Sequence, residues 1–511
     1  MDRVGELGHS GPDGGGGFDV AETRQVGYER LGEKRLTLVD VIAQSVGFIA
    51  PVFSAAFLIP LIAGAGAAGR GAGVATPFAV ILAAVGVYAL GWIVAQYAKR
   101  VHAAGSLYDY VTMGLGGYTG GVAGWVYYGG TTILTSAVAT LIGGFVHDVL
   151  LGEYGWEPLP GWAWSVIFVV AVFLVLYLGV QISTRAQLTL ALVSAAALLV
   201  FFVSIVFQTE TNSLKAFNPG EAADGLPGVL FGVVYGVLIF VGFETAANLA
   251  EETAEPKRAI PRAVLLSVVI VTAYYVIAAY AQVAGFHFDI RTFTSPEVFG
   301  AGPILVLGSG EADAGPFGYG STVIRQVLEV FILLDILAVG LGTATASTRG
   351  VFALARDRRI PSPLAAVSPS RGSPTGALVF VESISLLMVG LSYWTRTLFQ
   401  LPETPPELHY FSLFVWLSTF GGFALLLVYA LMAIGAFRGL ADHPNRAGVI
   451  LAGVLGLAVA GGGIYGGIYK VPSPANLVWV YCLLWLALGM IVTLVVKGRA
   501  PASEVLVDLR E

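Results

Sequence analysis

Long apolar segments recur along the whole chain and restrict it to a membrane environment. A helix needs about 18–25 mostly apolar residues to cross a bilayer core about 30 Å thick, and polar residues, Pro or Gly separate successive spans. Of the 511 residues, 56% are hydrophobic and 12% are charged, which is more apolar than a soluble core requires. The sequence therefore predicts an all-α polytopic membrane protein with about 12 transmembrane helices, near residues 38–63, 75–98, 119–149, 162–182, 185–207, 227–250, 261–286, 323–355, 375–395, 408–437, 447–468 and 475–497.

One membrane domain accounts for most of the chain. We expect it to occupy residues 37–497, between a disordered cytoplasmic tail at 1–36 and a second cytoplasmic tail at 498–511. The first tail has no apolar segment and contains a run of glycines at 14–17, so we expect neither a cleavable signal nor a stable fold there. Most of the 27 Lys and Arg residues lie in the tails and the even-numbered turns, which predicts a cell-membrane protein with both termini in the cytoplasm.

Several other functional classes find no support in the sequence. The formal net charge is −6 without a basic patch, so nucleic acid is not an expected partner. The single cysteine, Cys482, argues against disulfide and zinc frameworks, and the histidines do not converge on a metal site. The stretch 64–69 matches a GxGxxG pattern, but it follows a transmembrane segment rather than a strand, so nucleotide binding is not expected. We expect no cofactor and no enzymatic activity.

Two of the predicted spans are interrupted at matching places. The first span carries Val-Gly-Phe at 46–48, shortly before Pro51, and the sixth carries the same tripeptide at 241–243, directly before Glu244. Glycine is a poor helix former, and a broken helix exposes backbone N–H and C=O groups that a zwitterion or a small cation can bind. Such interruptions at corresponding places in two halves of a chain indicate a transporter built from inverted repeats, with its site near the membrane midplane.

Three tracts of the chain resemble the amino acid–polyamine–organocation (APC) transporter superfamily. The first is residues 242–263, where Gly-Phe-Glu is followed by Glu-Glu, Pro-Lys-Arg and Ile-Pro-Arg-Ala. The second, residues 98–125, resembles the family's segment between helices 2 and 3, and the third, residues 347–361, resembles the end of its helix 8. The resemblance covers about residues 30–497. The chain departs from the family's pattern at 102–106, where a Pro and paired glycines are usual, and at the first break, which has a single glycine.

The resemblance implies a leucine-transporter-like 5+5 inverted repeat, with helices 1 and 6 unwound around the substrate. On this expectation the first repeat covers residues 38–207, the second covers 227–437, and helices 11 and 12 occupy 447–497. The implied function is secondary active transport of amino acids or related amines by alternating access. A channel and a transport-inactive amino acid sensor of the same fold are the alternatives, and the substrate, the direction of transport and the oligomeric state are left open.

We expect the substrate to bind at the two helix breaks. A carboxylate at membrane depth costs about 2.5–3.5 kcal/mol on insertion scales, so Glu244 must face a cavity, a partner or a proton. We therefore predict that it is either a substrate ligand or a proton-sensitive latch. Aromatic residues such as Trp416 are candidates for closing over the substrate, or for ordinary packing. The predicted substrate-binding residues are Ser45, Val46, Gly47, Phe48, Ile49, Phe240, Val241, Gly242, Phe243 and Glu244.

The eighth predicted span, residues 323–355, which is helix 8 in the family's order, carries most of the candidates for binding a coupling ion. Some proton-coupled members of the resembling family have a lysine in helix 5, where this chain has Ser194, and this favours sodium over ion-free exchange or a proton. Helix 8 hydroxyls and helix 1 carbonyls would bind the ion, although such hydroxyls often bond to carbonyls of their own helix. Glu329 and Asp335 lie on different faces of helix 8, and Glu382 is expected to form a structural pair. The possible coupling-ion residues are Ala43, Val46, Thr343, Thr345, Ser347 and Asp335.

Overall fold

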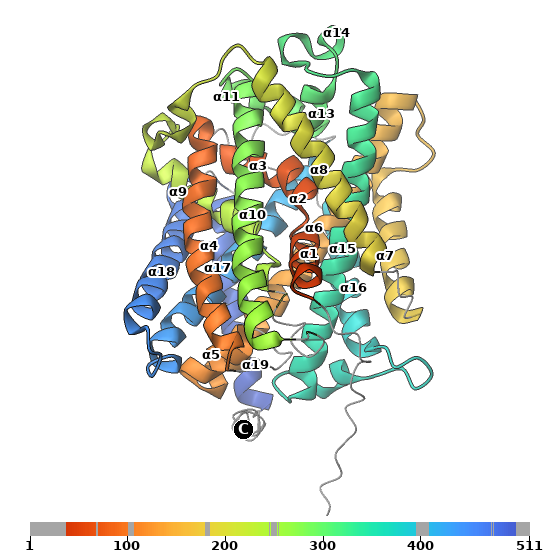
Figure 1. The fold of residues 1–511 in the computed structure, drawn as a ribbon. Helices are drawn as coiled ribbons and strands as arrows, with labels where there is room; N and C mark the ends of the chain where they lie inside the picture. The colour runs from red at the N-terminus through yellow and green to blue at the C-terminus, as the bar shows by residue number, and fades with distance from the viewer. Residues whose placement is uncertain are drawn as a thin grey trace, which may run out of the picture.

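Every regular element of the described chain is helical (Figure 1). The computed structural model describes residues 37–67, 70–100, 107–178, 184–244, 255–394, 408–471 and 475–496, together with Ala246, Thr253 and Ser473. Within these ranges the long helices lie side by side in one bundle, and short helices cover its upper end in the view of Figure 1. The all-α fold expected from the sequence is therefore confirmed. The two predicted tails lie outside the described residues.

Each of the twelve predicted spans contains a helix. Ten runs are long and apolar enough to cross a membrane, and the other two spans contain the shorter apolar helices α9 and α16. The first span consists of α1 (Leu38–Ile49), α2 (Pro51–Phe53), the π-helical turn η1 (Ser54–Leu58) and α3 (Ile59–Ala63). The other spans are α4 (Thr76–Ala98), α6 (Gly117–Tyr154), α7 (Gly161–Leu178), α8 (Thr184–Gln208), α9 (Leu226–Leu238), α10 (Pro256–Gly285), α15 (Thr322–Arg356), α16 (Thr375–Trp394), α17 (His409–Gly439), α18 (Arg446–Ile468) and α19 (Val478–Val496).

Short helices fill the connections between the spans. Helix α5 (Leu107–Leu115) lies next to α6 at the lower end of the bundle in Figure 1. The connection between α10 and α15 contains α11 (Ile290–Phe293), α12 (Pro296–Ala301), α13 (Pro303–Gly308), α14 (Glu311–Ala314) and the 3₁₀ turn η6 (Gly315–Phe317). The remaining 3₁₀ turns are η2 (Gly73–Ala75), η3 (Leu214–Phe217), η4 (Pro219–Glu221), η7 (Ser362–Ala365) and η9 (Ala475–Leu477).

Helices α6 and α17 pack against each other inside the bundle. Helix α6 also contacts α15, α7 and α5, and α17 also contacts α18 and α9. The approach of α6 to α17 is close, because a Cβ atom built on Gly130 would lie 2.8 Å from the Cβ atom of Ala424. Small residues at such contacts let transmembrane helices gain packing contacts that lipid tails do not provide.

The first span breaks at Ala50, within the interrupted stretch 45–51 that the sequence predicted but three residues after Gly47. Gly47 lies inside α1, which continues to Ile49, and Ala50 adopts a left-handed conformation with φ 53° and ψ 72°. The physical reason is Pro51, which has no backbone N–H and disfavours the right-handed helical conformation of the residue before it. The second half of the span, residues 51–63, starts at this proline and is helical throughout.

The sixth span is interrupted where the sequence predicted. Helix α9 ends at Leu238, and the chain then turns through residues 239–242. Gly242 has a φ of 114°, which side chains other than glycine rarely adopt. The glycine in this Val-Gly-Phe tripeptide is therefore required by the backbone, whereas Gly47 occupies an ordinary helical position. The inverted-repeat relation between the two halves stays a prediction.

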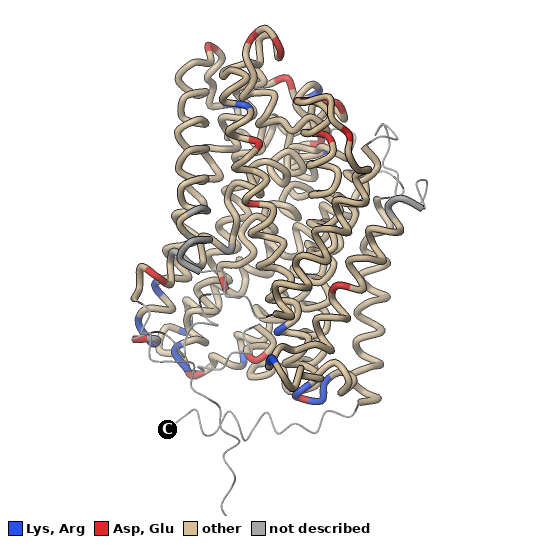
Figure 2. The backbone as a smooth tube through the Cα atoms, turned by 90° about the vertical axis from the view of Figure 1, so that its right-hand side faces the viewer, with Lys and Arg blue, Asp and Glu red and all other residues tan. Residues whose placement is uncertain are grey.

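Charged residues concentrate at the two ends of the bundle. Figure 2 shows that the middle of the bundle contains few charged residues, and that Lys and Arg gather at the lower end, close to the C-terminal marker. This distribution is what a bilayer requires, because a charged side chain facing lipid at the midplane is costly. It agrees with the excess of Lys and Arg on one side that the sequence predicted, and the assignment of that side to the cytoplasm stays a prediction.

Gly47 and Gly242 should differ in how well they tolerate replacement by alanine. We expect Gly242→Ala to destabilise the purified protein by about 1–3 kcal/mol, because its backbone conformation is unfavourable for alanine. Gly47→Ala should leave the melting temperature unchanged or raise it, because alanine favours an ordinary helix. Thermal denaturation in detergent, followed by size-exclusion chromatography, measures both variants. Equal melting temperatures for the two variants would contradict the assignment of the breaks.

Candidate substrate site at the two helix breaks

Glu244 connects the break of the sixth span to helices α6 and α17 through hydrogen bonds. Its side chain is 1% exposed, and its Oε2 atom accepts a hydrogen bond of 3.1 Å from the backbone N–H of Gly242. Its Oε1 atom accepts bonds from the hydroxyls of Tyr127 in α6, at 2.8 Å, and Tyr429 in α17, at 3.3 Å. Both carboxylate oxygens therefore have partners, and the turn, α6 and α17 meet at one side chain.

This environment supports the latch alternative for Glu244. A substrate that bound to this carboxylate would have to compete with two tyrosine hydroxyls, which come from different helices. Losing one partner of a buried charged group costs about 1.5–3 kcal/mol, so opening this cluster is unfavourable unless something replaces the lost bonds. The sequence predicted the carboxylate but not its tyrosine partners, because a hydroxyl inside an apolar span does not reveal which distant residue it contacts.

Asp335 of α15 fills the same role at the break of the first span. Its Oδ2 atom accepts a hydrogen bond of 2.7 Å from the backbone N–H of Phe53, in the first turn after the break at Ala50. The side chain is 3% exposed. Its other oxygen, Oδ1, has no hydrogen-bond partner among the described residues. Asp335 therefore caps the N-terminus of the second half of the span with one oxygen, and its second oxygen has no partner among the described residues.

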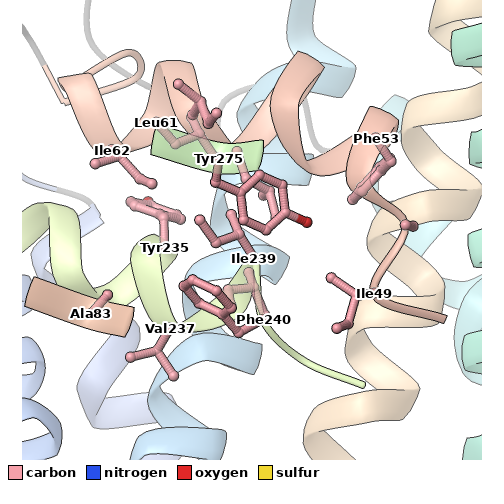
Figure 3. Packing of buried hydrophobic residues seen from close by; sticks show 14 of the residues in the cluster. Ile49, Phe53, Leu61, Ile62, Ala83, Tyr235, Val237, Ile239, Phe240 and Tyr275 are labelled. Carbon is pink, nitrogen blue, oxygen red and sulfur yellow. The ribbon is translucent and has the colours of Figure 1, made fainter. Parts of the chain in front are cut away.

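Tyrosines of α10 connect the two breaks. The ring of Tyr275 lies edge-on to Phe240 of the sixth span, with centroids 5.6 Å apart, and Figure 3 shows its hydroxyl directed toward the segment between Ile49 and Phe53. Both Tyr274 and Tyr275 lie close enough to Asp335 to interact with it electrostatically. The neighbourhood of the first break is therefore aromatic, with polar groups at one side.

The predicted residues of the first span lie in the last turns of α1. Ser45 is fully buried, and its hydroxyl has no partner among the described residues. Val46 and Ile49 are also buried, whereas the side chains of Ala43 and Phe48 are outside the described part of the chain. The backbone at 45–49 is helical rather than open, so only the carbonyl groups of its last turn lack partners within the helix.

The predicted residues of the sixth span form the turn itself. Phe240 and Phe243 are fully buried, and Val241 is partly buried. Phe243 packs against Tyr429, with ring centroids 6.0 Å apart. Trp416 lies next to Tyr481 of α19, at 5.8 Å between centroids, which supports the packing alternative for this residue.

The possible coupling-ion residues do not form one group. Asp335 lies eight positions before Thr343 along α15, or about 12 Å at 1.5 Å per residue. The hydroxyls of Thr343 and Thr345 bond to the Gly340 and Leu341 carbonyls of their own helix, at 3.2 and 2.7 Å. Ser347 is buried, and its hydroxyl has no partner among the described residues. The same holds for the neighbouring Thr348, which was not among the predicted residues.

The other carboxylates of these spans have distinct surroundings. Glu329 accepts a hydrogen bond of 3.2 Å from Arg325, which also forms an ion pair with Glu153 at 2.6 Å. Glu329 is thus paired near the start of α15, and Asp335 is the carboxylate that reaches the break. Glu382 of α16 is 4% exposed, and its Oε1 atom has no partner within the described ranges, so the expected structural pair is not found there.

Comparison with known proteins identifies the family. Residues 46–440 match the amino acid permease family, a match that includes both breaks and the helix that carries Asp335. The chain belongs to this family.

Relatives of this permease have different named substrates. An uncharacterized transporter of Mycobacterium tuberculosis is 30% identical over 355 residues, covering 69% of this chain and 72% of its own. The branched-chain amino acid permease BcaP of Bacillus subtilis is 24% identical, over 65% of this chain and 70% of its own. The low-affinity putrescine importer PlaP of Escherichia coli is 26% identical, over 70% of this chain and 74% of its own.

The fold of the permease also resembles a solved transporter structure. A crystal structure of the Eremococcus coleocola manganese transporter covers 92% of this chain and 95% of its own, with a TM-score of 0.51. Sequence identity is 12%, so the likeness concerns the fold alone.

Two of the tracts that resemble the superfamily meet at the end of the permease opposite the short helices α11–α14. Tyr108 of α5 donates a hydrogen bond of 2.6 Å to Asp357, which directly follows α15. Arg359 donates a bond of 2.9 Å to the carbonyl of Gly117 at the start of α6. Burial raises the pKa of the neighbouring Asp109 to about 7, and the Asp357 carboxylate contributes to the increase. The sequence analysis noted both tracts but not that they touch.

Replacing Glu244 by glutamine tests the latch. We expect Glu244→Gln to change substrate uptake about tenfold or more and to alter its pH dependence, because an amide cannot accept at both positions and does not titrate. Glu382→Gln, the same change at a buried carboxylate outside the site, should leave uptake unchanged. Uptake by each folded variant is measured between pH 5 and 8. Wild-type kinetics for Glu244→Gln over that range would contradict the role of this residue.

The raised pKa of Asp109 should make the stability of the folded permease depend on pH. Because its pKa rises from 3.8 to about 7 in the folded permease, folding favours its protonated form. The stabilising effect is therefore complete below about pH 4 and is lost as the pH rises toward 7. We expect Asp109→Asn to raise the melting temperature relative to wild type at pH 8 and to have little effect at pH 4. An effect that is the same at both pH values would rule out this interpretation.

Proposed function

We propose that this permease is a secondary active transporter that moves amino acids or related amines across the cell membrane by alternating access. The observation that supports this most strongly is the arrangement at the two breaks. Tyr275 contacts Phe240 of one interrupted span and faces the break of the other, so both breaks border one buried hydrophobic cluster (Figure 3). Interrupted helices around a buried site are the usual architecture of carriers that bind a small solute at the membrane midplane.

The proposed mechanism uses the backbone and the carboxylates at the breaks. The solute enters from one side and binds beside the last turn of α1 and the turn at residues 239–244. Rocking of one group of helices against the other then closes that side and opens the opposite side. Tyr108 and Asp357, which join α5 to the end of α15, are suited to holding one end closed. The termini are proposed to face the cytoplasm.

Sodium is the first coupling ion to test. Ser347 and Thr348 provide buried hydroxyls without partners among the described residues, and Ser45 provides a third in the first span. Oxygen ligands of this kind suit a hard monovalent cation. Exchange without an ion and coupling to protons through Glu244 or Asp335 are the other possibilities within the proposal.

Uptake into proteoliposomes tests the proposed function. Purified protein is reconstituted, and uptake of radiolabelled leucine and of radiolabelled putrescine is measured with and without unlabelled solute inside. A carrier gives saturable uptake that internal unlabelled solute accelerates, whereas protein-free vesicles show neither effect. A sensor would bind without uptake, and a channel would give unsaturable flux without acceleration. Repeating the measurement with an inward sodium gradient or an inward proton gradient, one at a time, identifies the coupling ion.

A further inference from the structure

The N-terminus of the second half of the first span is already occupied by a carboxylate of the protein. The first N–H groups of a helix have no partner within the helix and carry a partial positive charge, so in interrupted spans they bind the anionic groups of solutes. Here the N–H of Phe53 donates to Asp335 Oδ2 at 2.7 Å, the N–H of Val52 also interacts with this carboxylate, and Pro51 has no N–H to offer. Asp335 therefore occupies the position at the helix N-terminus where the carboxylate of a solute would otherwise bind.

The groups that remain open at this break are acceptors of hydrogen bonds. Asp335 Oδ1 is buried and has no partner among the described residues. The carbonyl groups in the last turn of α1, directly before the break, form the negative end of that helix, and the last of them, that of Ile49, accepts a bond of 3.4 Å from the Ser54 hydroxyl. The hydroxyl of Tyr274, near Asp335, also lacks a partner among the described residues. An ammonium group offers three donors and no acceptor, which matches this set.

No cation of the described chain neutralises Asp335. The ion pairs of Lys, Arg and His within the described ranges all involve other carboxylates, such as Glu153, Asp224 and Asp442. A buried carboxylate without a counter-charge is costly, and a bound cation removes that cost. The surrounding side chains are apolar and include the aromatic rings of Phe53, Tyr275 and Phe240 (Figure 3). Aromatic faces favour an organic cation over a hydrated metal ion.

We propose that this site takes a primary amine without a carboxylate group, whose ammonium binds Asp335 Oδ1 and the carbonyl groups at the end of α1. This inference rests on the proposed function and selects the amine from the two solute classes that it includes. An amino acid brings a carboxylate as well, which would lie against Asp335 or would have to displace it from the N–H of Phe53. The named relatives include an amino acid permease and a putrescine importer, so family membership does not decide between the classes.

Matched pairs of solutes test the proposal. Each amino acid is compared with its own decarboxylated amine: leucine with 3-methylbutylamine, ornithine with putrescine, and tyrosine with tyramine. The full chain is used for thermal-shift measurements in detergent and for uptake into proteoliposomes. We expect at least one amine to stabilise the protein and to be transported with an affinity about tenfold or more above that of its amino acid, because the carboxylate of the amino acid would be repelled by Asp335 or would have to break its bond to the N–H of Phe53.

Variants of Asp335 link the selectivity to this carboxylate. Asp335→Asn keeps an oxygen for the N–H of Phe53 but removes the charge, so it should remain folded and lose about tenfold or more in amine affinity. Asp335→Glu should restore part of the affinity, and Glu382→Gln should have no effect. Size-exclusion chromatography checks the folding of each variant, and the selectivity of the wild-type protein tests the proposal independently of any variant.

The outcomes separate this proposal from the proposed function. Transport of amino acids in preference to their amines would overturn the proposal and leave the transporter function intact. Stabilisation by sodium chloride alone that disappears in Asp335→Asn, with no effect of amines, would overturn it in favour of a metal-ion site. Absence of uptake for every member of every pair would overturn both. Amine-selective uptake that depends on Asp335 supports both.

Discussion

A bilayer does not hydrate backbone groups, so each break in a membrane-spanning helix must find partners inside the protein. In this permease a buried carboxylate provides them at both breaks. Asp335 accepts from the N–H of Phe53 at the first break, and Glu244 accepts from the N–H of Gly242 at the second. The interrupted spans depend on these two side chains, because an unsatisfied buried N–H group costs about 1–3 kcal/mol.

The two carboxylates differ in what they leave available. Glu244 comes from the interrupted segment itself, and both its oxygens are engaged by the turn and by tyrosines of α6 and α17. Asp335 comes from a different span, α15, and only one of its oxygens is engaged among the described residues. The first arrangement ties the break to neighbouring helices, and the second leaves a negative charge open at the break of the first span. This contrast is the basis for proposing a structural role for Glu244 and a binding role for Asp335.

The sequence predicted the spans well and the contacts between them poorly. Apolar runs locate helices because the bilayer imposes their length, and Gly242 marked its break because the backbone there requires glycine. At the other break the glycine of the tripeptide, Gly47, did not mark the position, since a glycine fits within a helix whereas Pro51 cannot continue one. The bond between Phe53 and Asp335 joins residues 282 positions apart, and no local pattern signals a contact of that range. The tyrosine partners of Glu244 were missed for the same reason.

Hydrogen–deuterium exchange at the first break tests most directly whether Asp335 closes it. Peptides that cover the start of the second half of the first span are compared between the wild-type permease and Asp335→Ala, in the same detergent. The account predicts faster exchange in the variant at the N–H of Phe53 and its neighbours, with unchanged exchange at the turn that Glu244 holds. Identical exchange at the first break in both proteins would show that Asp335 does not hold it, and the central claim would be wrong.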